Sequence, residues 1–574
     1  MIRLAQDLTS RLAEAVRAAQ AHGALPAFDL PELTVTHAEK LELGDYTTPA
    51  AMRLAKLARM KPDDIAQLIA AHFPETEYVG SVEAVRGFVN FRLADAWLQR
   101  QVDVILAEGE RFGRLDSHAG QKAQVECVSA NPTGPITVGR IRGGVIGDTL
   151  ARILRSVGYT TELEYYYNDA GSQIDHLGES LRARYLTELG RATPVPADGY
   201  QGDYVIGLAK DLIAIQGSSL MEGDDLSPFK KFAVEKISAW QKKSLARVGI
   251  VFDNYFSEQS VYTDGSIEKV LDMLKERDLT YSALVPDKLE GSDQDQRPDA
   301  EEREATATGP ALYLRLIRIR GARKDVPLVK SIGEPTYRLP DIAYHVNKLN
   351  RGFDIAINVL GADHIDEAKD VKATVGALGY PADRIRHIIH QFVTLSGSKQ
   401  STRRGEYVTL DELVDEVGAD AVRYFTLARS PDSKIDFDLD LAVEQSSENP
   451  VYYIQNARVR CVSMARVAAE RGLSGQDGDV SLLTDPRELA LIRKLIELPE
   501  IVELAAEDLA PHKLAFWAHE ELARLFHPTY EEVRALHTEV PQDRARARLK
   551  LYEASRVVFE RVLALLGMSA PDTM

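Results

Sequence analysis

Apolar residues along this chain recur with two different periods, and each period predicts one type of element. Helical spacing of apolar residues predicts four helices in the first part of the chain, over 4–22, 48–56, 63–72 and 94–108. Apolar and polar residues alternate over 87–93, which predicts a strand, and the short apolar run 122–128 predicts another. The chain therefore begins as an α/β protein.

The same two periods continue beyond this point. Strands are expected at 163–167, 313–319 and 355–360, and helices dominate 194–274 and everything after 431. The final helix carries an apolar stripe that ends at a glycine, formed by Leu551, Val558, Val562, Leu565, Leu566 and Gly567. The stretch 287–309 is polar, acidic and without period, which predicts a flexible surface loop.

The stretch 125–148 combines both periods around a cluster of turn residues. A short buried strand is broken by Pro132, Gly134 and Pro135, and a helical period begins at about Val138. A strand that turns tightly into a glycine-containing helix can present the helix N-terminus to phosphate. Glycines in such a helix can equally serve close packing against the strand, and the spacing alone leaves both interpretations open.

Composition narrows the class of protein. At 574 residues with 45% hydrophobic content, the chain is large enough for two to four domains. Its two cysteines, far apart in sequence, exclude a disulfide scaffold and a four-thiolate zinc site. No apolar run is long enough to span a membrane, and no signal peptide is evident, so we expect a cytoplasmic protein. A net charge of −18 disfavours general affinity for nucleic acid but permits a local basic groove.

The residues of 125–139 resemble the first signature of a class I aminoacyl-tRNA synthetase, and of an arginyl-tRNA synthetase in particular. The matching residues are Glu126, Ser129, Asn131, Pro132, Thr133, Gly134, Pro135, Val138 and Gly139. Thr137 and Arg140 replace the two histidines that this family carries, which donate to phosphate in the transition state. Asn168–Gln173 also matches a family element, N-D-A-G-x-Q.

The resemblance implies three sets of site residues. The arginine-binding set comprises Glu126, Ser129, Asn131, Tyr337 and Asp341. The ATP-binding set comprises Gly139, Gly143, Gly361, Asp363 and His364. Catalytic roles fall on Thr137, Arg140, Lys399, Ser401 and Arg403, the last three within a loop similar to the second class I signature. Glu126 has a second interpretation, as a structural acid paired inside the fold.

The resemblance also implies an architecture and partners. We expect a small α/β domain of the type that contacts the tRNA elbow at 1–110, and a Rossmann-like catalytic domain at 111–430 with a helical insertion at about 190–280. An all-α anticodon-binding-type domain should follow at 431–574. The implied partners are arginine, ATP with Mg²⁺, and tRNA(Arg). No protein metal site is expected, and the chain should be a monomer.

Two hypotheses for function remain open at this stage. In the first, the chain is an arginine–tRNA ligase in which Arg140, Lys399, Arg403 and Arg404 compensate for the replaced histidines. In the second, it is a paralogue that binds arginine but has weak or no aminoacylation activity. The second hypothesis is motivated by departures at the phosphate positions and at the anticodon-type positions 456–460 and 529–531, while the arginine-binding set is intact.

Overall fold

The computed structural model describes residues 3–169, 171–287, 300–397 and 408–574. Its centre is a five-stranded sheet in which every neighbouring pair of strands is parallel. The strand order is β12 (Ile385–His390), β11 (Ile355–Gly361), β5 (Lys122–Glu126), β6 (Thr160–Tyr167) and β7 (Asn254–Ser257). Helix α5 (Val138–Ser156) packs on one face, and the side chains of α13 (Arg338–Asn350) reach the other. This is the doubly wound arrangement that places a ligand at the carboxyl ends of the strands.

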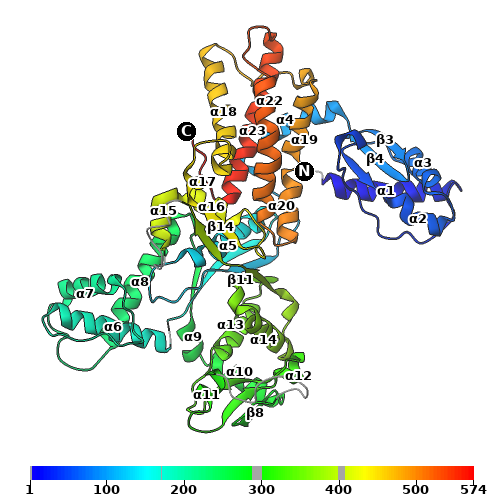
Figure 1. Ribbon diagram of the computed structural model, residues 1–574. Helices are drawn as coiled ribbons and strands as arrows, with labels where there is room; N and C mark the ends of the chain where they lie inside the picture. The colour runs from blue at the N-terminus through cyan, green and yellow to red at the C-terminus, as the bar shows by residue number, and fades with distance from the viewer. Residues whose placement is uncertain (1–2, 170, 288–299, 398–407) are drawn as a thin grey trace.

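The N-terminal part of the chain is a separate lobe at the side of the molecule (Figure 1). It consists of an antiparallel sheet in the order β1-β2-β4-β3 with three helices. Its elements are α1 (Leu4–Ala21), β1 (Thr36–His37), β2 (Tyr46–Thr48), α2 (Ala50–Ala58), α3 (Pro62–His72), β3 (Val79–Val85) and β4 (Phe88–Leu93). The expected helices at 4–22, 48–56 and 63–72 and the strand at 87–93 are confirmed to within two residues at each end. Helix α4 (Asp95–Glu108) then leads to the central sheet.

Helices connect β6 to β7 and form a second lobe with its own apolar core. They are α6 (Ser172–Glu188), α7 (Asp203–Gln216) and α8 (Ser227–Arg247). After β7 follow α9 (Glu258–Thr263), α10 (Ser266–Glu276) and a three-stranded antiparallel sheet of β8 (Thr280–Ala283), β9 (Ala311–Leu314) and β10 (Val326–Val329). Helix α14 (Ile365–Ala377) lies against α13 and β12.

Among the described residues after β12, the chain is helical apart from one short strand pair. Strands β13 (Val393–Ser396) and β14 (Ile435–Asp438) are parallel, and between them lie α15 (Leu410–Val417) and α16 (Ala419–Leu427). The C-terminal bundle contains α17 (Leu439–Val443), α18 (Pro450–Glu470), α19 (Pro486–Ile496), α20 (Leu498–Glu507), α21 (His512–Phe516), α22 (Arg524–Glu532) and α23 (Gln542–Leu566). The apolar stripe expected on the last helix is buried, and Gly567 ends it in the left-handed conformation.

One buried arginine joins the bundle to the central sheet. Arg423 on α16 donates to Asp148 of α5 at 2.6 Å and to the carbonyl oxygen of Leu566 at 2.6 Å. Its guanidinium lies where a Cβ on Gly567 would stand, so only glycine fits at this helix end. Because a buried charge that loses its partner is costly, this contact fixes α5 relative to the C-terminal helices.

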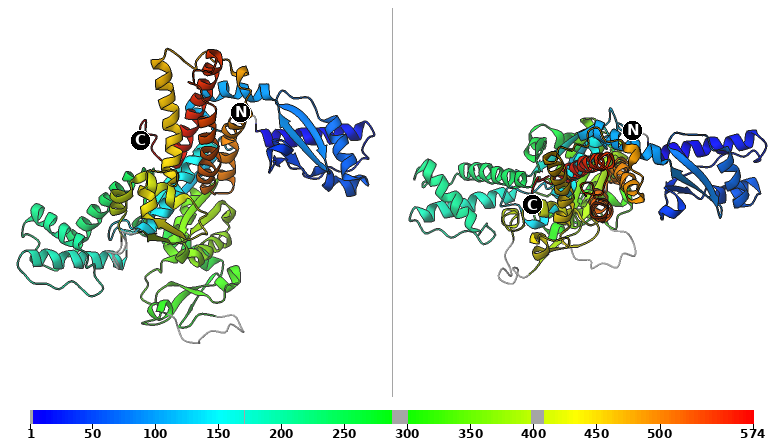
Figure 2. Two further views of the ribbon diagram at one scale, coloured as in Figure 1. Left: turned by 45° about the horizontal axis from the view of Figure 1, so that its top comes forward. Right: turned by 90° about the horizontal axis from the view of Figure 1, so that it is seen from above.

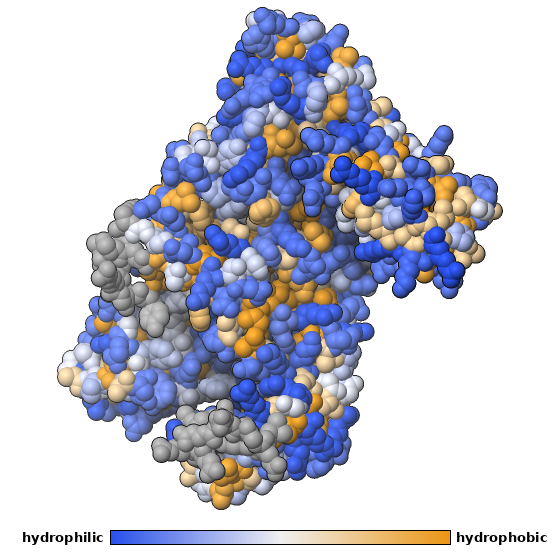
Figure 3. Space-filling model, turned by 45° about the vertical axis from the view of Figure 1, so that its right-hand side comes forward, coloured by the Kyte–Doolittle hydropathy of each residue, from blue (hydrophilic) through white to orange (hydrophobic). Residues whose placement is uncertain are grey.

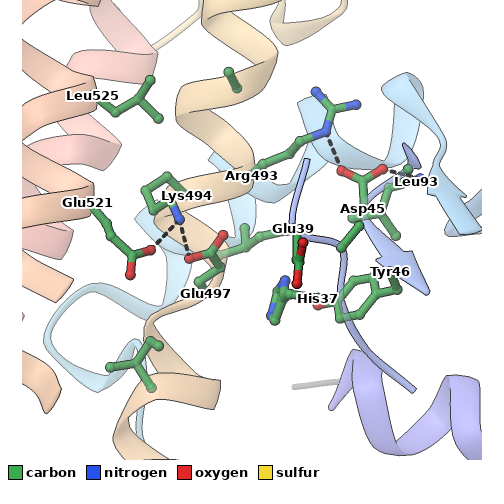
Figure 4. Close-up of a pocket in the computed structure, with 15 residues that line it drawn as sticks. His37, Glu39, Asp45, Tyr46, Leu93, Arg493, Lys494, Glu497, Glu521 and Leu525 are labelled. Atoms are coloured by element: carbon green, nitrogen blue, oxygen red, sulfur yellow. Dashed lines mark hydrogen bonds and ion pairs between the residues drawn. The ribbon is translucent and has the colours of Figure 1, made fainter. Parts of the chain in front are cut away.

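The N-terminal lobe lies beside the helices of the bundle (Figure 2). The two meet through ion pairs around a cavity of about 480 Å³ (Figure 4). Arg493 of α19 lies 2.6 Å from Asp45, and His37 lies 2.7 Å from Glu500 of α20. Lys494 contacts both Glu497 and Glu521 across the cavity wall. None of the side chains expected to bind arginine or ATP lies in this cavity.

Three expectations about local structure were wrong. Strand β5 ends at Glu126 rather than continuing to Val128, because Val128 and Ser129 have φ values of +68° and +40° that leave the extended conformation. Residues 316–319 of the strand expected at 313–319 lie instead in helix α12 (Leu316–Arg320). Part of the expected irregular loop 287–309 forms helix α11 (Ala300–Ala305), in which Glu302 is buried and lies 2.6 Å from Lys324.

Candidate active site at the carboxyl edge of the sheet

Polar side chains form a row across the central sheet, level with the carboxyl end of β5. Glu126, the last residue of β5, pairs in register with Asn358 of β11 and with Glu164 of β6. Glu164 in turn pairs with Asn254 of β7. Because residues in register on parallel strands face the same side, these four side chains lie in one line. All but Asn254 are buried, so these side chains need hydrogen-bond partners from the element that covers this face of the sheet.

Helix α13 supplies those partners. The Nζ atom of Lys348, which is fully buried, lies 2.5 Å from Oε2 of Glu126 and 2.6 Å from Oδ1 of Asn358. Arg351 donates to Oε2 of Glu164 at 2.5 Å. Burial opposes ionisation of Glu164, but the hydrogen bond from Arg351 and the charge of Lys348 outweigh it and lower its pKa to about 2. The row is thus a charge-balanced network rather than a set of free acids.

Glu126 is a paired acid in this network, which is one of the two interpretations that its sequence position allowed. Besides Lys348, it accepts a hydrogen bond from Oγ of Ser129 at 2.9 Å. Ser129 Oγ also accepts from the backbone amide of Tyr166 at 3.2 Å. These contacts hold the strained turn after β5 in place. A role for Glu126 and Ser129 in binding arginine stays a prediction.

A second group of acids surrounds Asp341, which lies in the first turn of α13. Burial raises the pKa of Asp341 well above its ordinary value, and the charges of Glu367, Glu126 and Glu258 raise it further. Glu258, at the start of α9, is only 5% exposed, and its burial raises its pKa to about 7. Ionised acids crowded in this way repel one another, and a cation placed between them stabilises their ionised forms.

The other residues of the expected arginine-binding set lie around these acids or face solvent. Tyr337 directly precedes α13, and 64% of its surface is exposed. Asn131 donates a hydrogen bond to Gln173, so the first signature and the N-D-A-G-x-Q element lie together. The structure therefore groups Glu126, Ser129 and Asp341 on one side of the sheet edge, with Asn131 on the neighbouring loop.

The helix of the first signature begins at Val138, where its apolar period predicts. Thr137 is the N-cap of α5, and Gly139 and Arg140 in the first turn are exposed. Thr137 forms an antiparallel bridge with Thr409, and the amide of Val138 donates to the carbonyl oxygen of Val408 at 3.2 Å. The helix dipole and the exposed first turn make this end of α5 suited to an anion.

The expected ATP-binding residues of β11 lie beside this helix end. Gly361 ends β11, and Asp363 and His364 follow in the short turn η3 (Ala362–His364). A hydrogen bond to Glu367 raises the pKa of His364, burial opposes the shift, and the nearby charge of Asp363 raises it further. The charge of Arg140 acts on the same imidazole in the opposite direction, so the end of α5 and the η3 turn share one electrostatic environment.

Four functional candidates emerge only from the structure. Lys348, Asn358 and Glu258 were not singled out from the sequence, and neither was His390, which ends β12 opposite Gly361. Lys348 follows Asp341 by seven residues on a buried helix, and residues seven apart lie on the same helix face. This spacing is a signal in the sequence from which Lys348 could have been predicted. Asn358 inside the apolar run of β11 is a second such signal, since a buried amide needs partners.

The second signature lies outside the described residues, and so do the expected catalytic residues Lys399, Ser401 and Arg403. Within the described part of the chain, no group of three histidine, cysteine, aspartate or glutamate side chains could hold a metal ion. No helix among the described residues is long and apolar enough to cross a membrane. The face in Figure 3 is largely hydrophilic, with scattered hydrophobic patches.

Comparison with known families gives three matches along the chain. Residues 6–93 match the arginyl tRNA synthetase N terminal domain, residues 378–462 match tRNA synthetases class I (M), and residues 454–574 match the DALR anticodon binding domain. The fold is also that of the arginyl-tRNA synthetase from Thermus thermophilus, with a TM-score of 0.74 and 23% identity over the full length of both chains. Fold and signature helix together define a class I aminoacyl-tRNA synthetase.

Sequence relatives give the particular family. The chain is 38% identical to the arginine–tRNA ligase of Dehalococcoides mccartyi strain CBDB1 over 98% of both chains. It is 40% identical to the arginine–tRNA ligase of Carboxydothermus hydrogenoformans over the whole of both chains. This chain belongs to the arginyl-tRNA synthetase family.

Proposed function

We propose that the chain is an arginine–tRNA ligase, which activates arginine with ATP and transfers it to tRNA(Arg). The observation that carries the proposal is the acid group of Asp341, Glu258 and Glu126 together with the exposed first turn of α5. Glu367, whose charge acts on Asp341, lies 3.6 Å from His364, and the charge of Arg140 in that first turn acts on His364. A guanidinium is a permanent cation with planar donors, and acids withdrawn from water are the groups that recognise it. A phosphate site at a helix N-terminus next to such a pocket fits the two substrates of the activation step.

The reaction itself needs orientation and charge stabilisation. A carboxylate oxygen of arginine bonds to the α-phosphorus of ATP, the bond between the α-phosphorus and the bridging oxygen breaks, and pyrophosphate leaves with that electron pair. A ribose hydroxyl at the tRNA 3′ end then attacks the activated carbonyl carbon, loses its proton and expels AMP. The protein contributes by holding the reacting atoms in line and by donating to the phosphate oxygens.

The phosphate side of the proposed site consists of Thr137, Gly139, Arg140 and Gly143 on α5 with Gly361, Asp363 and His364 on the facing edge. Lys399, Ser401 and Arg403 complete it in our proposal. Mg²⁺ would enter bound to the ATP phosphates, as it commonly does in nucleotide sites. The proposed role of the first turn of α5 rests on its exposure and on its position at the positive end of the helix dipole.

The outer lobes are proposed to serve tRNA. We assign 1–110 to the tRNA elbow, 111–430 to catalysis, with the insertion at about 190–280, and 431–574 to the anticodon region. Arg460 on α18 lies 3.0 Å from Glu531 and 5.2 Å from the ring centre of Tyr530, so its charge is partly neutralised within the protein. We propose that the chain acts as a cytoplasmic monomer, which size-exclusion chromatography with light scattering checks.

The paired Arg460 is the observation that favours a second candidate function. A basic side chain held by an acid is less available to RNA phosphates. In this second candidate, the chain binds arginine but activates it weakly or not at all.

ATP–pyrophosphate exchange distinguishes the two candidates. The assay contains arginine and tRNA(Arg), and arginine binding is measured in parallel by calorimetry. Exchange that depends on arginine supports the ligase. Arginine binding without exchange supports the second candidate. If neither exchange nor arginine binding is observed, arginine is not the substrate of this chain and both candidates are contradicted.

A further inference from the structure

His390 lies inside the proposed phosphate site, on β12, a strand to which the sequence analysis assigned no functional residue. It ends β12 and pairs in register with Gly361 of β11. Its Nε2 atom lies 2.9 Å from the point where a Cβ on Gly143 would stand. The imidazole therefore occupies space that only a glycine in the second turn of α5 leaves open. A residue expected to contact ATP and an unassigned histidine are thus direct neighbours.

The ring of His390 is oriented by the backbone. Its Nδ1 atom lies 3.3 Å from the carbonyl oxygen of Gln391, and because a carbonyl only accepts, the proton resides on Nδ1. The same carbonyl accepts from Arg142 at 2.8 Å, and the buried Arg142 also donates to the carbonyl oxygens of Ser430 and Ser433. Among the described residues, Nε2 of His390 makes no hydrogen bond. It is left directed at the signature helix.

The surrounding charges favour a neutral imidazole at His390 in the absence of an anion. Burial lowers the pKa of His390, the contact with Gln391 opposes this, and the charges of Arg142 and Arg140 lower the pKa further, against the charge of Asp363. The two arginines lie on α5, and the aspartate, which is exposed, lies on η3. A phosphate oxygen at Nε2 would reverse the balance and favour the doubly protonated donor.

We propose that His390 supplies, from the end of β12, an imidazole donor to the ATP phosphates in place of the signature histidines that Thr137 and Arg140 replace. The inference deepens the proposed function and rests on it. Residue 390 is a new position for this donor, on a strand rather than on the signature helix. Compensation of this kind requires proximity to the same helix end, which the contact with Gly143 provides.

The first test replaces His390 with alanine and measures exchange. Loss of one positioned donor to a developing charge costs about 10²–10³ in rate, so kcat should fall by about 10²-fold while the KM for arginine stays within about threefold. His387→Ala is the matched control, because His387 lies on the same strand three residues away and faces the opposite side of the sheet. The control should retain kcat within about threefold. Equal losses in both variants would overturn the proposal.

The second test is a rescue that a packing role could not give. Adding Thr137→His to His390→Ala should recover at least about tenfold of the lost kcat, because it returns a donor to the signature helix. Gly143→Ala provides a further variant, since its Cβ would stand 2.9 Å from Nε2 and displace the ring. It should lower kcat by about tenfold or more although alanine favours a helix. Full activity in Gly143→Ala, or no rescue by Thr137→His, would contradict the inference.

Failure of the proposed function can be told apart from failure of this inference. If the unmodified protein shows no exchange, ATP binding is measured by calorimetry for the unmodified protein and for His390→Ala. A loss of ATP affinity by about tenfold in the variant, with none in His387→Ala, keeps the inference while the ligase proposal fails. Unchanged ATP affinity in His390→Ala overturns it.

Discussion

The guanidinium side and the phosphate side of the proposed site differ in how their side chains are held. On the guanidinium side, Glu126 and Lys348 are buried and paired within a network that spans the sheet. On the phosphate side, Arg140 is exposed, and the side chains of Asp363 and His364 are 58% and 41% exposed. A buried network cannot lose one member without leaving an unpaired charge, whereas an exposed residue can change at small cost to the fold. The departures from the family pattern at Thr137 and Arg140 lie on the exposed side.

The strongest way to break this comparison is to remove one partner of the buried pair. Lys348→Met leaves Glu126 as an uncompensated buried acid and should lower the free energy of unfolding by about 3–5 kcal/mol, measured by urea denaturation. Arg140→Ala is the counterpart on the phosphate side and should change it by less than about 0.5 kcal/mol. The double variant Glu126→Gln with Lys348→Met should recover a large part of the loss. Similar losses for Lys348→Met and Arg140→Ala would refute the contrast.

The next largest effect concerns binding of arginine. Asp341→Asn removes one carboxylate from the acid group and should weaken arginine binding by about 10²-fold, the cost of truncating one partner of a buried charge pair. Binding of ATP should change by less than about threefold. Calorimetric titration of each substrate measures both values. A larger effect on ATP binding than on arginine binding would contradict the placement of Asp341 on the guanidinium side of the site.

The dependence of arginine binding on pH sharpens the comparison further. Burial raises the pKa of Glu258 to about 7 and raises that of Asp341 well above its ordinary value, so both acids gain protons as the pH falls. A cationic ligand binds the ionised acids better, so arginine should bind about tenfold more tightly at about pH 8 than at about pH 6, with release of protons. The Glu258→Gln variant should flatten this profile. Tighter binding at the lower pH would contradict it.

The smallest effect is expected from restoring histidine to the signature helix. Thr137→His and Arg140→His in the otherwise unmodified protein should raise exchange, but by less than about tenfold, because His390 already provides one donor in our proposal. An unchanged rate would place the deficit outside the signature helix. A gain of about 10²-fold or more would show that His390 does not compensate.

Much of the fold was predictable because periodicity reports burial. The helices over 4–22 and 63–72 carry strong apolar stripes, and each is found within two residues of its expected bounds. The helix expected to begin at about Val138 begins at that residue. The strand prediction was wrong over 316–319 because leucine and isoleucine alternate with arginine there, a pattern that a short helix also satisfies. Helix α11 was not predicted because its contacts, such as that of Glu302 with Lys324, are long-range ion pairs that no local sequence pattern reveals.

The candidate site was predictable only in part. Motif matches located Glu126 and Asp341, and the structure brings both into one electrostatic group. Motif matches could not show that Glu126 forms an ion pair with Lys348, because the two residues lie 222 positions apart in the sequence. His390 ends β12 and Glu258 directly follows β7, and the order of the strands in the sheet, which no local sequence pattern encodes, brings both to the site.

The most direct test of the account is a calorimetric comparison of arginine with citrulline at about pH 8. Citrulline has nearly the same shape but a neutral urea group in place of the guanidinium. If the acids around Asp341 recognise a cation, arginine should bind at least about 10²-fold more tightly than citrulline, and Asp341→Asn should abolish most of the difference. Equal affinity for the two ligands, or an undiminished preference in the variant, would contradict the central claim that this acid group reads the guanidinium.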